Sequence, residues 1–318
     1  MKRLSAIGAG MTVAPQATQI VSNRNDTTAH RWAFLALLLG NVALAAGPFL
    51  VRHSGVGPVA AGFWRMALAL PFLWLVALVL RQPLRLPRLA LVGAIALAAF
   101  FFAADLAAWH VGILLTKLGN ATLFGNWSSF LFAAWGLWLA RKWPTWVQAL
   151  ALGLAALGCG LLMVGSAELS AAHLRGDLLC ALAGLLYTFY LIFVERTRSE
   201  VAPLPLLILA SLFGAAMLLP TAMLAGEQIF PTDWTALFAL ALCSQVIGQG
   251  LLVYALGHVP PLIVGIAMLT QPALSALLGY VYYDEALTGL DWLGAMLIVT
   301  ALILVRLRVA QRQATLAS

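Results

Sequence analysis

The stretch FFFAADLAAWHVGILLTKLGNATLFGNW at residues 100–127 decides the fold class, because it is a long apolar segment interrupted by a few polar side chains. Asp105 and His110 lie inside apolar chain, and Asn126 follows in the next apolar run. A carboxylate within a hydrophobic span costs about 2.5 to 3.5 kcal/mol on insertion scales, so it usually faces a protein interior or a water-filled cavity. The stretch therefore predicts a membrane protein with a polar interior.

The composition of the whole chain agrees with this prediction. The 318 residues are 63% hydrophobic and 9% charged, whereas soluble domains carry roughly 25% charged residues. The net charge of +7 does not indicate nucleic-acid binding, because Lys and Arg stand singly between apolar runs instead of clustering. Cys159, Cys180 and Cys243 also fall in apolar runs without metal-type spacing, so we interpret them as small packing residues and expect no metal.

Ten apolar runs are long enough to cross a bilayer, which takes around 20 residues. They are separated by Pro, Gly or charged residues. The runs are 32–51, 59–80, 89–111, 119–140, 145–165, 176–194, 203–225, 234–257, 260–283 and 288–305. We therefore predict an all-α polytopic membrane protein with ten transmembrane helices.

The Lys and Arg residues predict the orientation of these helices, since positive loops stay in the cytoplasm. With both termini inside, the inner loops hold most of the basic residues, and the outer loops hold only Arg52, Lys117 and Arg175. Residues 1–30 lack a continuous apolar segment and are predicted to be a flexible cytoplasmic tail. Residues 307–318 are predicted to be a cytoplasmic C-terminal tail. We expect a multi-pass protein of the bacterial inner membrane.

The second half of the sequence repeats the first at a shift of about 145 residues. Pro58 aligns with Pro203, Trp109 with Tyr254, and Asn126 with Gln271. Each half holds five predicted helices, an odd number, so the two halves must cross the membrane in opposite directions. Inverted repeats are typical of transporters, whose sites lie near the midplane between the halves. The predicted repeats are residues 31–167 and 168–306.

Three short motifs resemble a known family. They are Phe63-Trp64-Arg65 early in the second run, Leu269-Thr270-Gln271-Pro272 in the ninth, and Tyr283-Asp284-Glu285-Ala286-Leu287-Thr288 before the tenth. In their order, spacing and ten-helix context, they resemble the drug/metabolite transporter superfamily, in particular its EamA-type exporters, over about residues 32 to 306. The resemblance implies export from the cytoplasm. It also implies amino acids as the substrate class, including exporters of the aromatic amino-acid type.

Arg65 and Asp105 are predicted to lie at similar depth, each about six residues from the outer end of its helix. We interpret them as an ion pair that either locks two helices together or serves as a polar gate and substrate anchor. Trp109 follows Asp105 by four residues and shares its helix face. His110 is turned aside, and is either a proton carrier or a solvated interfacial histidine.

A second set of side chains is neutral and spread over both halves. Such residues either line a cavity for zwitterions or sugars, or hydrogen-bond neighbouring helices; we favour the cavity. With the deep aromatics that could stack on a substrate, the predicted substrate-binding residues are Asn41, Trp109, Asn126, Trp127, Tyr187, Gln245, Gln249 and Gln271.

Two features refine this prediction. Gln245 and Gln249 are four residues apart and share a helix face. Gln271 precedes Pro272, which either kinks the helix or frees a carbonyl for a neighbour or ligand. The Gly- and Ala-rich runs 145–165 and 288–305 contain almost no polar side chains, so we place them outside the cavity as structural supports or an oligomer contact.

The functional hypothesis is a secondary transporter that exports small polar metabolites, with amino acids as the best substrate class. No phosphate-binding Gly-rich motif is present, so ATP is not the direct energy source, and no cofactor is expected. A membrane-embedded enzyme and a non-transporting sensor are the alternatives, but catalytic motifs and a large soluble domain are both missing. The expected partners are the small-molecule substrate and the lipid bilayer, with the protein a monomer or a homodimer.

Overall fold

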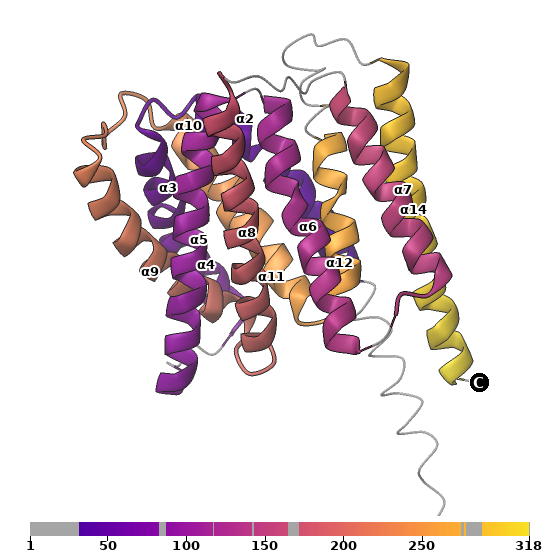
Figure 1. Cartoon of the computed structure of the whole chain (residues 1–318). Helices are drawn as coiled ribbons and strands as arrows, with labels where there is room; N and C mark the ends of the chain where they lie inside the picture. Colours follow the sequence, from indigo (N-terminus) through magenta and orange to yellow (C-terminus); the bar gives the residue numbers. More distant parts are fainter. Residues whose placement is uncertain are drawn as a thin grey trace, which may run out of the picture.

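The computed structural model describes residues 32–82, 87–116, 118–141, 143–164, 172–274, 277 and 288–317. Over these residues the chain forms helices and connecting turns, and none of them belongs to a strand (Figure 1). The all-α class is confirmed.

The helices follow the predicted apolar runs, and each run is mostly helical where the structure describes it. Their bounds are Trp32–Arg52, which includes α2 (Gly47–Arg52), then α3 (Pro58–Ala67), α4 (Ala69–Val79), α5 (Leu89–Leu115), α6 (Leu118–Ala140), α7 (Trp146–Val164), α8 (Leu174–Thr197), α9 (Pro203–Leu224), α10 (Thr235–Leu240), η1 (Ala241–Gln249), α11 (Gly250–Leu256), α12 (Pro261–Met268) and α14 (Gly289–Ala317). Of the tenth run's preceding motif, residues 283–287 lie outside the described residues.

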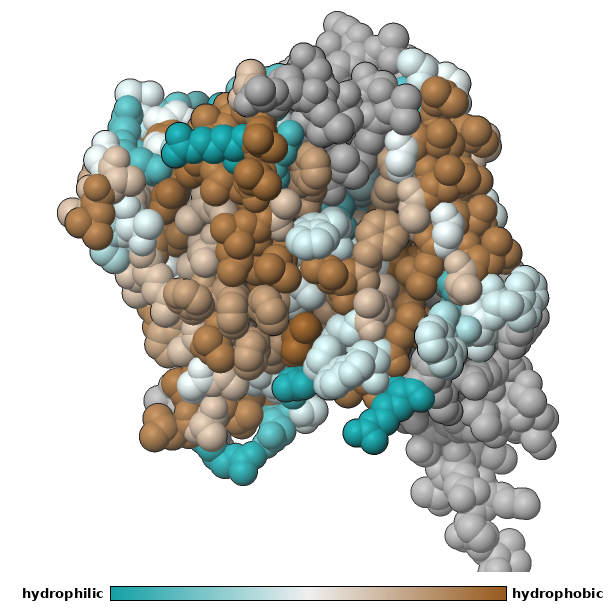
Figure 2. Space-filling model, in the orientation of Figure 1, coloured by the Kyte–Doolittle hydropathy of each residue, from teal (hydrophilic) through white to brown (hydrophobic). Residues whose placement is uncertain are grey.

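Six helices among the described residues are long and apolar enough to cross a membrane, judged by length and composition. They are Trp32–Arg52, Pro58–Val79, Leu89–Leu115, Leu174–Thr197, Pro203–Leu224 and Thr235–Leu256. Trp146–Leu162, Pro261–Leu274 and Gly289–Leu304 are shorter apolar helices. A polytopic membrane protein is therefore confirmed, and the count of ten spans stays a prediction. Much of the visible face in Figure 2 is hydrophobic, as expected of a surface in contact with lipid.

Several helices are interrupted near the middle of the bundle. The first helix has a turn at Ala46 before Pro48, and the ninth run has one at Leu269 before Pro272. Proline lacks the N–H that would bond the carbonyl four residues earlier, so these breaks are expected, and the predicted disruption at Pro272 is confirmed. The eighth run widens into the nine-residue π-helix η1. Non-helical backbone at membrane depth is tolerated where it is buried in protein or lines a cavity.

Helices α7 and α14 pack against each other at one side of the bundle (Figure 1). The two backbones come close at Gly158, where an added Cβ would lie 2.6 Å from the carbonyl oxygen of Gly294. Glycine at both positions lets the two backbones touch. The prediction that these two runs offer close-packing faces away from the cavity is confirmed, since none of the cavity's lining residues belongs to either helix.

Candidate functional site

A cavity of about 70 Å³ lies among the interrupted helices. A single water needs roughly 10 to 15 Å³ by the same kind of measure, so the space holds several waters or part of a small solute. Its lining comes from both halves of the chain: Leu44, Arg65, Phe102, Asp105, Leu106, Trp109, Gly125, Asn126, Ser128, Gly184, Tyr187, Gln249, Met268 and Gln271. Both formal charges of this lining, Arg65 and Asp105, come from the first half.

Arg65 is held in place from the second half of the chain. Its Nε donates a hydrogen bond to Oε1 of Gln245 at 3.2 Å, and the Gln245 amide nitrogen donates to the hydroxyl of Ser211 at 2.9 Å. The guanidinium carbon also lies 5.5 Å from the ring centroid of Phe102, within range of a cation–π attraction. The hydrogen bond to Gln245 uses Nε of Arg65, so the two terminal amino groups of Arg65 remain to meet a ligand in the cavity.

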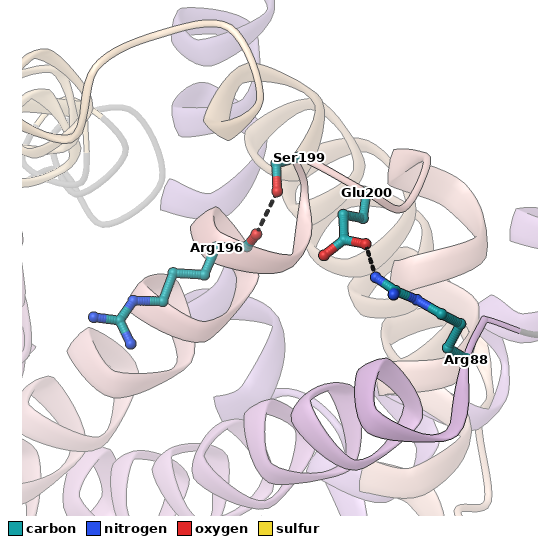
Figure 3. A network of polar contacts seen from close by, with 4 residues as sticks. All are labelled: Arg88, Arg196, Ser199 and Glu200. Atoms are coloured by element: carbon teal, nitrogen blue, oxygen red, sulfur yellow. Dashed lines mark hydrogen bonds and ion pairs between the residues drawn. The ribbon is translucent and has the colours of Figure 1, made fainter.

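Asp105 lines the same cavity but forms no direct ion pair with Arg65. The one salt bridge among the described residues joins Arg88 to Glu200 at an end of the bundle (Figure 3). The predicted direct pair is therefore corrected to two opposite charges that face one cavity. The physical reason is that Gln245 and Phe102 hold the guanidinium, which leaves the Asp105 carboxylate to water or to a ligand.

An amide and phenol network, which we call the amide wall, supplies much of the remaining polar lining. Gln249 accepts a hydrogen bond from the hydroxyl of Tyr190 at 3.2 Å and donates one to the hydroxyl of Tyr187 at 3.0 Å. Gln271 donates to Oδ1 of Asn41 at 3.1 Å, and Asn41 donates to the carbonyl of Ala267 at 2.8 Å. Asn41 therefore satisfies a carbonyl next to the helix break that precedes Pro272.

The predicted substrate-binding residues divide into two groups. Trp109, Asn126, Tyr187, Gln249 and Gln271 line the cavity. The remaining three lie behind or beside it. They are Asn41 and Gln245, which hold lining side chains from behind, and Trp127, which lies outside.

Trp127 packs on the outside of the α6–α8 contact. Its indole nitrogen donates to the carbonyl of Ala181 at 2.8 Å, and 39% of the residue is exposed. The ring lies so close to Gly184 that a Cβ there would be 2.3 Å from it. In this structure Trp127 packs between two helices and is not among the residues that line the cavity.

His110 is fully buried and lies away from the cavity lining. Its Nδ1 lies 2.9 Å from the carbonyl oxygen of Pro58, and because a carbonyl can only accept, this nitrogen carries the hydrogen. The alternative of a solvated interfacial histidine is wrong, because the ring is enclosed by protein. Trp109, its neighbour, lies between Gly47 and Gly125 and covers one side of the cavity.

Sequence reasoning did not find every residue of the site. Ser211, Phe102 and Ser128 looked like ordinary residues of apolar helices, and Gly125 and Gly184 like packing glycines. The π-helix was also missed, although π-turns often occur at functional sites. In this region, the sequence predicted only that Gln245 and Gln249, four residues apart, share a helix face.

Known proteins share part of this sequence and most of this fold. Residues 174–307 match the model of the EamA-like transporter family. These residues are therefore similar to an EamA-like transporter domain. The resemblance to EamA-type exporters of the drug/metabolite transporter superfamily is thereby confirmed.

Among curated proteins, the chain is similar to the threonine/homoserine exporter RhtA of Salmonella typhimurium (strain SL1344), with 30% identity over 152 residues. The match to the exporter of the same name in Escherichia coli (strain K12) has the same identity and length. Each match covers 46% of this chain and 50% of the relative. The matched region thus spans about half the length of these relatives.

A solved structure shares the fold of most of the chain. This crystal structure of a protein superposes with a TM-score of 0.71 at 19% sequence identity. The match covers 90% of this chain and 98% of the solved one. At this identity the similarity shows the fold alone.

Proposed function

We propose that the protein is a secondary transporter that exports small amino acids across the bacterial inner membrane. The observation that carries the proposal is one small cavity faced by both a cation, Arg65, and an anion, Asp105, with amides around them. Free amino acids are zwitterions, so they present a carboxylate and an ammonium group to one site. Two opposite charges that do not neutralise each other directly suit such a ligand.

The individual contacts support this substrate class. The terminal amino groups of Arg65 would bind the carboxylate, since guanidinium and carboxylate geometries match. Asp105 would accept from the ammonium group. Asn126 and Gln271 would meet a polar side chain, and Trp109 an apolar part. The curated relatives are named as exporters of threonine and homoserine, small amino acids with a hydroxyl group.

The packing pattern supports two inverted repeats, which we propose to be residues 31–167 and 168–306. In such an arrangement a two-fold axis exchanges the first five runs with the last five. A run that lies next to this axis would pack against the run five places later in the sequence. The second and seventh runs (α3 and α4 against α9), the fourth and ninth (α6 against α12) and the fifth and tenth (α7 against α14) do pack together. The proposed repeats therefore meet along three matched helix pairs.

We further propose that the two repeats rock against each other around the cavity, which opens in turn to either side. The ten apolar runs would give ten spans, and the charge distribution of the loops would put both termini in the cytoplasm. The protein would act as a monomer or as a homodimer, with no cofactor and no nucleic acid. An electrochemical gradient, or the substrate's own gradient, would supply the energy.

Transport by purified protein in liposomes tests the proposal. We expect labelled threonine inside the liposomes to exchange with unlabelled amino acids outside. Analogues lacking either the ammonium or the carboxylate group should compete about tenfold less well, the loss expected for one charge-assisted hydrogen bond. Empty liposomes are the control. If no amino acid exchanges, or if both analogues compete as well as the parent amino acid, the proposal is wrong.

A further inference from the structure

The turns that end the second and seventh runs have the same backbone structure at a shift of 145 residues. At the end of α4, the N–H of Arg81 bonds the carbonyl of Leu78 at 3.0 Å. At the end of α9, the N–H of Gly226 bonds the carbonyl of Met223 at 3.1 Å. Arg81 and Gly226 both adopt a positive φ, at 51° and 67°. Such a left-handed residue is a common way to end a helix.

The residue after each turn reaches back to the start of the other helix of the pair. The carboxylate of Glu227 accepts hydrogen bonds from the backbone N–H groups of Val59 at 3.2 Å and Ala60 at 2.8 Å, at the start of α3. The amide oxygen of Gln82 accepts from the backbone N–H of Leu204 at 3.1 Å, at the start of α9. Gln82 and Glu227 are 145 residues apart, and so are Val59 and Leu204.

These two contacts lie at opposite ends of the bundle. The span Pro58–Val79 begins at the Glu227 contact and its closing turn carries Gln82. We name the two ends after the residues that precede α3 and α9, which are Gly57 and Ala202. The φ and ψ angles of these two residues agree within a few degrees. By the charge of the loops, the Gly57 end is predicted to be outside. Each contact joins one proposed repeat to the other.

The two contacts differ in strength, although their backbones match. Glu227 brings a charge and two hydrogen bonds to a helix N-terminus, where a negative charge is favourable. Gln82 brings one neutral hydrogen bond. At the Gly57 end, the indole of Trp64 also donates to the carbonyl of Ile229 at 2.6 Å. The Ala202 end has the Arg88–Glu200 salt bridge nearby, but both side chains are largely exposed, so it contributes little (Figure 3).

Gly57 is part of the stronger contact. A Cβ added to Gly57 would lie 2.4 Å from both the Cβ and a carboxylate oxygen of Glu227. The equivalent Ala202 carries a Cβ and faces only the single bond from Gln82. The small residue therefore stands where the charged side chain needs the space.

We propose that Glu227 and Gln82 are reciprocal latches between the repeats, and that the stronger Glu227 latch biases the transporter towards a conformation closed at the Gly57 end. The inference rests on the proposed alternating access. Rocking would separate each loop from the other repeat's helix at whichever end opens. Opening the Gly57 end breaks two charge-assisted bonds, whereas opening the Ala202 end breaks one neutral bond.

Cavity accessibility in the full-length protein tests the latches. Ser128 lines the cavity and is replaced by cysteine in a background whose three native cysteines are alanine. A membrane-impermeant maleimide is added to one side of sealed vesicles, and a separate cysteine at the exposed Asp233 reports which side holds the Gly57 end. Labelling from that side measures its opening.

We expect Glu227→Gln, which keeps the shape of the side chain, to raise labelling from the Gly57 end about fivefold to tenfold. Gln82→Glu should lower labelling from the Ala202 end, and the double exchange should reverse the bias. Gly57→Ala, which displaces Glu227 without changing its charge, should act like Glu227→Gln. Glu200→Gln, which removes the exposed salt bridge, is the matched control and should change labelling less than twofold.

Unchanged labelling from both sides in Glu227→Gln and Gln82→Glu, in folded protein that still transports, would overturn the latch proposal and leave the proposed function standing. Failure of the proposed function alone would give a different result. Labelling needs no substrate, so variants that shift accessibility in a protein that moves no amino acid would support the latches and contradict the proposed function.

Discussion

The charged wall of the cavity, made of Arg65 and Asp105, differs in chemistry from its amide wall, made of the amides and phenols. The first half supplies both charges, Arg65 and Asp105, whereas the second half supplies amides and phenols such as Gln249 and Tyr187. At the 145-residue shift, Arg65 corresponds to Ala210 and Asp105 to Gly250. The two halves thus contribute different chemistry to the site, which would bind a zwitterion in one orientation.

One pair of lining residues has the same chemistry at the 145-residue shift. Asn126 and Gln271 are equivalent, both are amides and both line the cavity. Their partners differ, because Asn126 donates to the carbonyl of Thr122 in its own helix and Gln271 donates to Asn41 in another helix. The charged wall should therefore dominate binding energy, and the amide wall should adjust it.

The largest effect should come from Arg65→Ala on the charged wall. The substrate carboxylate would lose charge-assisted hydrogen bonds that are worth about 1.5 to 3 kcal/mol, so exchange should fall about 10- to 100-fold. The measurement is initial rates of labelled amino-acid exchange in liposomes. Arg175→Ala, at an exposed position of α8, is the matched control and should be unchanged. Equal activity of the two variants would remove Arg65 from the site.

Asp105→Asn should have the next largest effect, because it keeps the side-chain shape and removes the charge that faces the ammonium group. Amino-acid exchange should fall about tenfold, the value of one charged hydrogen bond. Binding of the analogue that lacks the amino group should hardly change, so competition assays should show reduced discrimination between the two. Asp233→Asn at an exposed loop is the control. Full retention of discrimination would contradict the assignment.

A smaller effect is expected for Gln249→Leu on the amide wall. The change removes neutral hydrogen bonds to Tyr187 and Tyr190 but no charge that faces the substrate. Exchange should therefore fall about two- to tenfold, the loss expected for one neutral hydrogen bond. Gln148→Leu on α7, away from the cavity, serves as the control in the same assay. A loss as large as that of Arg65→Ala would show that the two walls are energetically equal.

The smallest effect should come from Trp127→Phe. Phenylalanine keeps an aromatic ring against Gly184 and loses one hydrogen bond to Ala181, so exchange should stay within about twofold. Trp109→Phe, inside the cavity, is the comparison and should alter the ranking of competing amino acids. If Trp127→Phe changes that ranking instead, this residue reaches the substrate in another conformation.

The fold class was predictable from local information, because each apolar run is long enough to show its hydropathy without reference to the rest of the chain. Most of the cavity's polar residues were also predictable, since amides and charges in apolar helices are costly and need a reason. The role of Gln245 was not, because its bond to Arg65 crosses 180 positions of sequence. The exposed setting of Trp127 was likewise invisible, as it depends on where α8 packs.

The sequence by itself determined the helical membrane class and the residue types available for a polar site, because hydropathy and spacing are properties of short segments. Only the tertiary structure decided that Arg65 is held by Gln245 instead of pairing with Asp105. It also decided that His110 bonds the carbonyl of Pro58 away from the cavity. The same holds for the contacts of Glu227 with the start of α3 and of Gln82 with the start of α9. These contacts depend on how the two halves pack, and packing joins residues that no local pattern relates.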